Sequence, residues 1–128
     1  MGERINISSG SPWKDVVGYS RAVKVGNVIE VAGTTAMDGN TVIGKGDVYA
    51  QAKFIFEKID KILKQAGSSM MDVVRTRMFV INIAEWELIG KAHAEFFKDI
   101  KPVATMVEVN KLINDDLLIE IEVTAIIV

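Results

Sequence analysis

The chain has 128 residues, of which 49% are hydrophobic and 25% are charged, and this size and balance predict one domain over residues 1–128. The formal net charge of -2 argues against a protein built to coat nucleic acid, because that binding depends on the neutralisation of phosphates. Cysteine is absent and histidine occurs once, which excludes disulfides and thiolate chemistry and argues against a His-rich metal site.

Membrane and secretion signals are also missing from the sequence. No apolar run reaches the ~18 residues that are needed to span a bilayer. Residues 1–4, MGER, lack the apolar stretch of a secretory signal. We therefore expect a cytoplasmic protein without a membrane partner.

Two short β-rich runs come first in the chain, at residues 21–25 and 28–33. Gly26 and Asn27 separate them, and this dipeptide suits a tight turn, so the two runs predict a β-hairpin. A second turn signal and a short β-rich run, residues 41–43, follow the hairpin.

Apolar residues at helical spacing predict two helices. The first helix follows Asp47, whose side chain can cap it, and ends at Gly67. The second covers residues 85–98. The apolar stripe of the first helix consists of Ala52, Ile55, Ile59, Ile62, Leu63 and Ala66.

Residues 73–83 predict a long strand between the helices, and two further strands, about 105–109 and 117–127, follow Pro102. The order β-β-α-β-α-β-β predicts an α+β two-layer sandwich with both helices on one face of the sheet. In the strands 73–83 and 117–127 neither side is uniformly polar. We therefore expect the sheet face without helices to be buried in an oligomer.

A family pattern is present near the C-terminus, where residues 102–109 read PVATMVEV and residues 119–123 read IEIEV. With these segments, and with Gly18-Tyr19 and the run 31–33 (VAG), the chain resembles the reactive intermediate deaminase family, RidA or YjgF, over nearly its whole length. The resemblance implies a chorismate-mutase-like fold with a mixed sheet, and a homotrimer with small-molecule clefts between subunits. It also implies cofactor-independent hydrolysis of reactive imines. No nucleotide loop, flavin motif or metal cluster is found in the sequence, so no cofactor is expected.

The resemblance assigns seven positions to the cleft. Glu120 matches the acidic residue of the family and is the catalytic candidate. Tyr19 matches an aromatic hydroxyl near the substrate. The expected substrate-binding positions are Tyr19, Ala32, Gly33, Gly90, Ala104 and Met106.

Four of these positions depart from the family pattern. Ala104 stands where the family has an arginine, whose planar fork holds the substrate carboxylate with two parallel hydrogen bonds. Ala32 occupies a frequent serine position, and Gly90 occupies an asparagine position of well-known members. Met106 replaces a residue that is often cysteine, although the backbone carbonyl implicated there is retained. These changes remove polar donors, so we expect a widened cleft for a neutral or differently charged carbonyl, imine or enamine compound instead of a free α-imino acid.

Glu120 is the titratable group that we expect to relay a proton, because a partly desolvated carboxylate can rise in pKa and act as a general acid or base. A structural explanation competes with this one. Glu120 and Glu122 share a strand face, and Arg75, Arg77 or Lys24 could pair with them across the sheet or a subunit boundary. The sequence leaves both interpretations open and favours a structural role for Glu122.

Three other side chains have a structural and a functional interpretation. Arg75 or Arg77 could replace the missing arginine, but two arginines that alternate beside an acidic strand are more typical of an ion-pair ladder. His93 lies beside the apolar stripe of the second predicted helix, near Phe96 and Phe97, which favours a packed histidine over a proton-transfer group.

Three function classes follow from the sequence. The leading hypothesis is a RidA-like imine or enamine hydrolase with altered substrate preference. The alternative is a catalytically inactive trimeric module that binds a small molecule or has a regulatory role. An endoribonuclease or translation inhibitor has the least support, because the sequence pI near 5.4 and the single histidine do not suit RNA cleavage.

Overall fold

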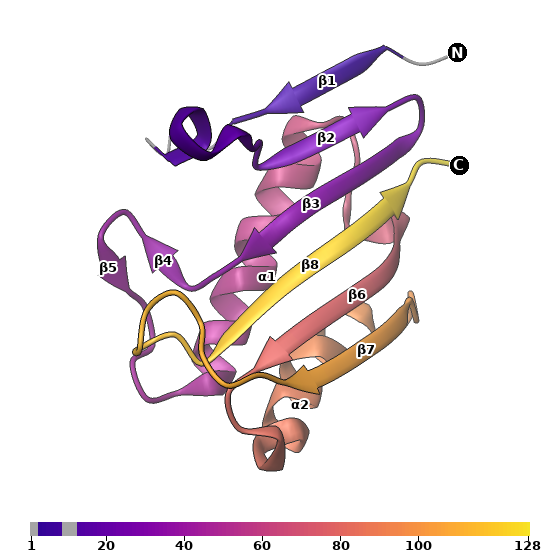
Figure 1. Ribbon diagram of the computed structural model, residues 1–128. Helices are drawn as coiled ribbons and strands as arrows, with labels where there is room; N and C mark the ends of the chain where they lie inside the picture. The colour runs from indigo at the N-terminus through magenta and orange to yellow at the C-terminus, as the bar shows by residue number, and fades with distance from the viewer. Residues whose placement is uncertain (1–2, 9–12) are drawn as a thin grey trace.

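A computed structural model describes residues 3–8 and 13–128. Six strands form one sheet in the order β1-β2-β3-β8-β6-β7. Both long helices lie on the same face of this sheet, and β1 and β7 form its edges (Figure 1). The elements are β1 (Arg4–Ile7), β2 (Ala22–Val25), β3 (Val28–Thr34), α1 (Val48–Gln65), β6 (Val73–Val80), α2 (Trp86–Phe97), β7 (Val103–Glu108) and β8 (Ile119–Ile126).

The pairing of the strands makes the sheet mixed. β6 and β7 are parallel, because α2 crosses over between them, whereas the other neighbouring strands are antiparallel. The α+β two-layer architecture predicted from the sequence is therefore confirmed. None of the helices in the described parts of the chain is both long and apolar enough to cross a membrane.

The predicted element order leaves out two features of the structure. β1 adds an edge strand before the first predicted one, and a π-helical turn spans Lys14–Gly18. Both segments are short, so they carry little periodic signal. The short β-rich run expected at 41–43 is present as β5 (Thr41–Val42), which forms a separate hairpin with β4 (Met37–Asp38). The strand expected at 73–83 ends at Val80, because the following residues form a short 3₁₀ helix that is capped by Asn82.

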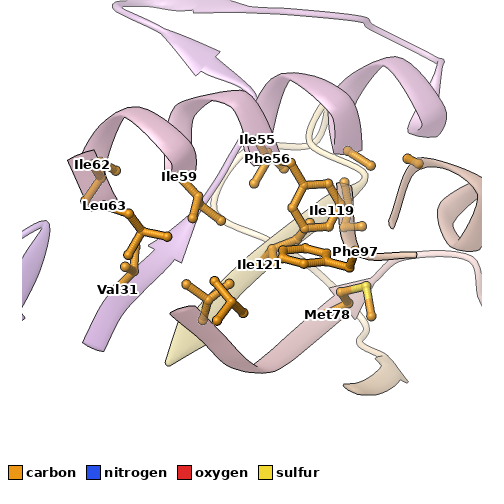
Figure 2. Packing of buried hydrophobic residues seen from close by; sticks show 14 of the residues in the cluster. Val31, Ile55, Phe56, Ile59, Ile62, Leu63, Met78, Phe97, Ile119 and Ile121 are labelled. Atoms are coloured by element: carbon orange, nitrogen blue, oxygen red, sulfur yellow. The ribbon is translucent and has the colours of Figure 1, made fainter. Parts of the chain in front are cut away.

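The first helix begins and ends where the sequence predicts. Asp47 Oδ1 accepts a hydrogen bond of 3.0 Å from the backbone N–H of Ala50. At the other end Gly67 adopts a φ of 79°, which a residue with a side chain rarely adopts. Between these ends the apolar stripe of α1 packs on the sheet, and Figure 2 shows its side chains facing Val31, Ile119 and Ile121.

A buried glutamine holds the start of β8 against α1. Gln51 is fully buried, and its side-chain amide donates to the carbonyls of Gly44 and Asp116. Its Oε1 accepts a bond of 2.8 Å from the N–H of Leu118. The amide is thus satisfied on both sides and fixes the chain two residues before Glu120.

The central strand β8 alternates strictly between the two faces of the sheet. Its buried residues, Ile119, Ile121, Val123 and Ala125, point towards the helices. Glu120 and Glu122 point to the other side, together with their cross-strand partners Phe79 and Arg77. We call this side, away from both helices, the open face.

Candidate functional site

The site residues that were expected from the sequence fall into two groups. Tyr19, Gly33 and Glu120 lie at the end of the sheet where β2 begins, β3 ends and β8 begins (Figure 1). Ala104 and Met106 lie on the edge strand β7, near the helices.

Gly33 and Glu120 are packed directly against each other. The pairing of β3 with β8 shifts register between Val31 and Thr34, which is a β-bulge that brings the backbone of Gly33 close to β8. A Cβ at Gly33 would overlap the Glu120 carboxylate at Oε2 and would lie 3.0 Å from its Cδ. The absence of a side chain at residue 33 therefore makes room for the carboxylate.

The carboxyl group of Glu120 is half-buried, and no hydrogen bond to it is present within residues 3–8 and 13–128. Burial raises the pKa of Glu120 above its ordinary value. The charge of Arg21 acts in the opposite direction and lowers the pKa, while the neighbouring Glu122 raises it further. The result is a carboxyl group suited to proton transfer nearer to neutral pH than an exposed glutamate.

Arg21 belongs to this group, and the sequence analysis assigned it no role in the site. Its Nη2 donates a hydrogen bond of 2.5 Å to the carbonyl of Gly33. Its guanidinium interacts electrostatically with Glu120 and with Tyr19. The sequence signal that could have found it is an arginine two residues after Tyr19, at the first position of the strand predicted at 21–25.

Lys58 supports the same end of β3 from α1. Its Nζ donates to the carbonyls of Thr35 and Met37 at 3.4 and 2.9 Å. Burial lowers the pKa of Lys58, and the nearby charge of Arg21 lowers it further. Two cations therefore hold three alternate carbonyls, those of Gly33, Thr35 and Met37.

Ala32 lines a hollow of about 370 Å³ on the open face. Arg77 and Glu122 also line it and form an ion pair of 3.3 Å across it. The expected pairing of an arginine of β6 with a glutamate of β8 is therefore present for Arg77 and Glu122. The expected pairing of Lys24 with these glutamates is not present in the described chain. Its Nζ instead donates to the carbonyl of Ala66 at the end of α1, on the helix side of the sheet.

The second group lies on the helix side. Ala104 is paired with Thr76, and Met106 with Met78, so both share the sheet face that the helices cover. Met106 packs against the hydrophobic core, while Ala104 is exposed at the edge of the sheet. The side chain at residue 104 therefore points away from the open face.

Gly90 and His93 border this edge from α2. His93 Nε2 lies 2.9 Å from Thr76 Oγ1, and its ring packs against Phe97, with ring centroids 4.8 Å apart. The interpretation of His93 as a satisfied, packed histidine is confirmed. Gly90 precedes it by one turn on the same helix side, and a Cβ at Gly90 would meet no atom within 4 Å.

The two groups are separated both across and along the sheet. Ala104 is level with Thr76, which pairs with Val123 of β8, and Val123 lies roughly 10 Å along the strand from Glu120. The side chains at 104 and 120 also leave the sheet on opposite faces. One copy of the chain therefore does not bring its own Glu120 to its own Ala104.

The described ranges contain no candidate metal site. No group of three or more histidine, aspartate or glutamate side chains there is arranged to hold a metal ion.

Comparisons with known proteins show the family and the fold. The family model described as Endoribonuclease L-PSP matches residues 11–127. A crystal structure of a Mycobacterium tuberculosis member of the YjgF/YER057c/UK114 family superposes with a TM-score of 0.88, at 44% sequence identity, and covers 98% of this chain and 100% of that one.

Two curated relatives are similar over nearly their whole length. A RutC family protein of Pyrococcus abyssi is 36% identical, over 98% of both chains. The 3-aminoacrylate deaminase RutC of Acinetobacter baylyi is 34% identical, over 94% of this chain and 95% of that one. The chain belongs to the YjgF/RidA family, whose family model carries the description Endoribonuclease L-PSP. Its fold is the chorismate-mutase-like fold of that family.

Proposed function

We propose that this protein is a cofactor-independent hydrolase of the imine or enamine deaminase type, with a substrate preference that does not depend on an arginine at residue 104. The observation that carries the proposal is the half-buried carboxyl of Glu120, whose pKa is raised and which lies on the backbone of Gly33. The deaminase name of the 34% identical relative from Acinetobacter baylyi supports the reaction type.

In this reaction water attacks the electrophilic carbon of a C=N bond, and the departing amine must take up a proton. Glu120 supplies that proton in its acid form and recovers one from the attacking water. A raised pKa suits both halves of the exchange, because the group is then not fully ionised near neutral pH. The exposed backbone of β7 beside Met106 contributes a carbonyl that orients the water.

We also propose that the site is completed between subunits of a homotrimer. The two groups of site residues lie on opposite sides of one sheet, so a cleft that contains both needs two copies of the chain. Apolar side chains on the open face and at the sheet edge would be covered by such an assembly. The exposed ones are Val25, Val28, Val103 and Val107.

A second candidate is a catalytically inactive trimeric module that binds a small molecule or has a regulatory role. It is favoured by the set Ala32, Gly90 and Ala104, none of which has a side-chain hydrogen-bond donor. Ribonuclease action, which the description of the family model names, is opposed by the net charge of -2 and by a single histidine that is already paired with Thr76.

Ammonia release from freshly generated imines separates these candidates. The panel should contain carboxylate-bearing and neutral imines, and the proteins should be wild type and Ala104→Arg. Turnover of any imine by wild type supports the hydrolase, and its preference identifies the substrate charge. Inactive wild type with an active Ala104→Arg variant would favour the binding module instead.

Native mass spectrometry tests the assembly independently of turnover. We expect a species of three times the 14.1 kDa chain mass. A monomer at micromolar concentration would contradict the intersubunit cleft.

A further inference from the structure

Two positive side chains hold the chain where β3 ends, and they come from different elements. Arg21, directly before β2, donates from Nη2 to the carbonyl of Gly33 at 2.5 Å. Lys58, on α1, donates from Nζ to the carbonyls of Thr35 and Met37 at 3.4 and 2.9 Å. The segment 33–37 is thus held at every second residue. We call Arg21 and Lys58 the cationic clamp.

The cationic clamp opposes folding more than a neutral pair of donors would. Burial lowers the pKa of both side chains, and the charge of Arg21 lowers the pKa of Lys58 further. Nε of Arg21 is inaccessible to solvent and has no hydrogen-bond partner within residues 3–8 and 13–128. A buried donor without a partner is costly, and so is a second like charge nearby. Neutral donors could hold the same carbonyls at a lower cost, so the shape of the segment alone does not explain the charges.

The segment that the clamp holds forms one wall of the space around the Glu120 carboxyl. A Cβ at Gly33 would overlap Oε2 of Glu120, so the carboxyl lies directly on the Gly33 backbone. The register of β3 with β8 shifts between Val31 and Thr34, and a β-bulge disrupts the ladder of hydrogen bonds locally. The position of the Gly33 backbone therefore depends on partners outside the ladder, and Arg21 is one of them.

We propose that Arg21 and Lys58 are positioning residues for the proposed reaction, and that they act by holding the Gly33 backbone against the Glu120 carboxyl. Neither side chain needs to contact the substrate. Arg21 has a second task, because its charge favours the ionised form of Glu120, whereas Lys58 acts through the segment alone. The inference rests on the proposed function for the reaction, but the position and titration of the carboxyl can be measured without it.

The charges in this region make the two tasks separable. Within the described residues, Arg21 lowers the pKa of Glu120, and the neighbouring strand β6 presents the uncharged Phe79 to it. Lys58 is close to Arg21, so it reaches the carboxyl only through the clamp and the segment. The other titratable groups that act on Glu120 or on the clamp are Tyr19, Asp38 and Glu122.

Loss of each clamp residue should shift the titration of Glu120 in the opposite direction. Arg21→Gln removes the charge and keeps an amide donor, so the pKa of Glu120 should rise because the cation no longer offsets desolvation. Lys58→Met removes the donor of two carbonyls, so the segment should loosen and admit water. The pKa of Glu120 should then fall towards that of an exposed glutamate. A role confined to the stability of the fold predicts the same direction for both variants.

The test follows Glu120 by ¹³C NMR of protein that is labelled in its glutamate side-chain carboxyls, and the signal is assigned by its absence in Glu120→Gln. We expect a higher midpoint in Arg21→Gln and a lower one in Lys58→Met. Arg21→Lys and Lys58→Arg, which keep the charge and a donor, should stay close to wild type. If either main variant does not fold, Arg21→Met or Lys58→Gln takes its place with the same expected direction. Lys61→Met, a matched change at an exposed lysine of α1, should leave the midpoint unchanged.

Turnover adds a second measurement. On an imine that wild type hydrolyses, Lys58→Met should lower kcat by about 10- to 100-fold with little change in KM, because a displacement of about 1 Å near the reacting groups can cost that much. Unchanged midpoints in both variants, shifts in the same direction, or an equal shift in Lys61→Met would overturn the proposal. Opposite shifts without ammonia release from any imine would refute the hydrolase alone. Turnover with an unchanged kcat in Arg21→Gln and Lys58→Met would refute the positioning role alone.

Discussion

The Glu120 carboxylate occupies the space that a side chain at Gly33 would fill. A Cβ built on Gly33 overlaps Oε2 of Glu120 and lies 3.3 Å from its Cγ. The two residues belong to adjacent antiparallel strands and meet at a β-bulge. The position of the proposed acid is thus set by a missing side chain on the neighbouring strand.

Gly33→Ala should therefore reduce activity more than stability. The added methyl group pushes away the flexible end of Glu120, while alanine at a position that does not need a positive φ restricts the unfolded chain. We expect the free energy of unfolding to change by less than about 1 kcal/mol. Ammonia release should fall towards the level of Glu120→Gln. A fully active Gly33→Ala protein would show that the position of the carboxylate does not matter.

The raised pKa of Glu120 has a defined effect on stability. The folded state prefers the protonated carboxyl, so ionisation opposes folding as the pH rises above the unfolded value of about 4.3. The free energy of unfolding of wild type, minus that of Glu120→Gln, should therefore fall as the pH rises from about 4.3 to the folded-state pKa of Glu120. Above that pKa the difference between the two proteins should stay constant. Denaturant unfolding of both proteins at several pH values measures the difference.

The matched control for this pH series is Glu122→Gln, because Glu122 lies on the same strand face and is paired with Arg77. The comparison of the two variants separates the effect of Glu120 from the general effect of removing one carboxylate from this strand face. A pH-independent difference for Glu120→Gln, or one of the opposite sign, would contradict the raised pKa.

His93 should titrate below the ordinary histidine value of about 6.5, because burial lowers its pKa. The chain has one histidine, so a single imidazole signal can be followed by NMR from acid to neutral pH. Stability should fall as the pH drops through about 6.5 towards the folded-state pKa, since the unfolded chain binds the proton first. A midpoint at or above 6.5 would contradict the burial of the ring.

Gln51 should be a strong stability determinant although it is far from the open face. Gln51→Ala leaves the N–H of Leu118 and the carbonyls of Gly44 and Asp116 without their buried partner. We expect a loss of about 2 to 3 kcal/mol in denaturant unfolding. The control Lys53→Ala, on the same helix but with an exposed 3.8 Å ion pair to Glu95, should lose less than about 1 kcal/mol.

Periodicity and capping gave most of the fold from the sequence. The cap at Asp47, the left-handed glycine at 67 and the alternation of β8 are local signals, so they could be recognised without the structure. The strand β1 was missed because four residues carry too little pattern. Family resemblance assigned Glu120 to a ligand cleft, and this assignment stays a prediction.

The arrangement of the candidate site depends on contacts that the sequence does not display. Arg21 meets Gly33 only because β2 and β3 pair and β3 then bulges. The opposite orientation of residues 104 and 120 follows from the registers of β6 with β7 and with β8. Such long-range registers are fixed by the folded sheet, so the missing arginine was visible in the sequence and the contact of Arg21 with Gly33 was not.

The central claim is that Glu120 transfers the proton in imine hydrolysis, and one comparison tests it directly. Ammonia release from the imine that wild type turns over fastest should be measured for wild type, Glu120→Gln and Glu122→Gln as folded proteins in the same oligomeric state. We expect Glu120→Gln to lose about 10²-fold or more in turnover, because general acid catalysis contributes that much, while Glu122→Gln stays close to wild type. Unchanged turnover in Glu120→Gln would contradict the account.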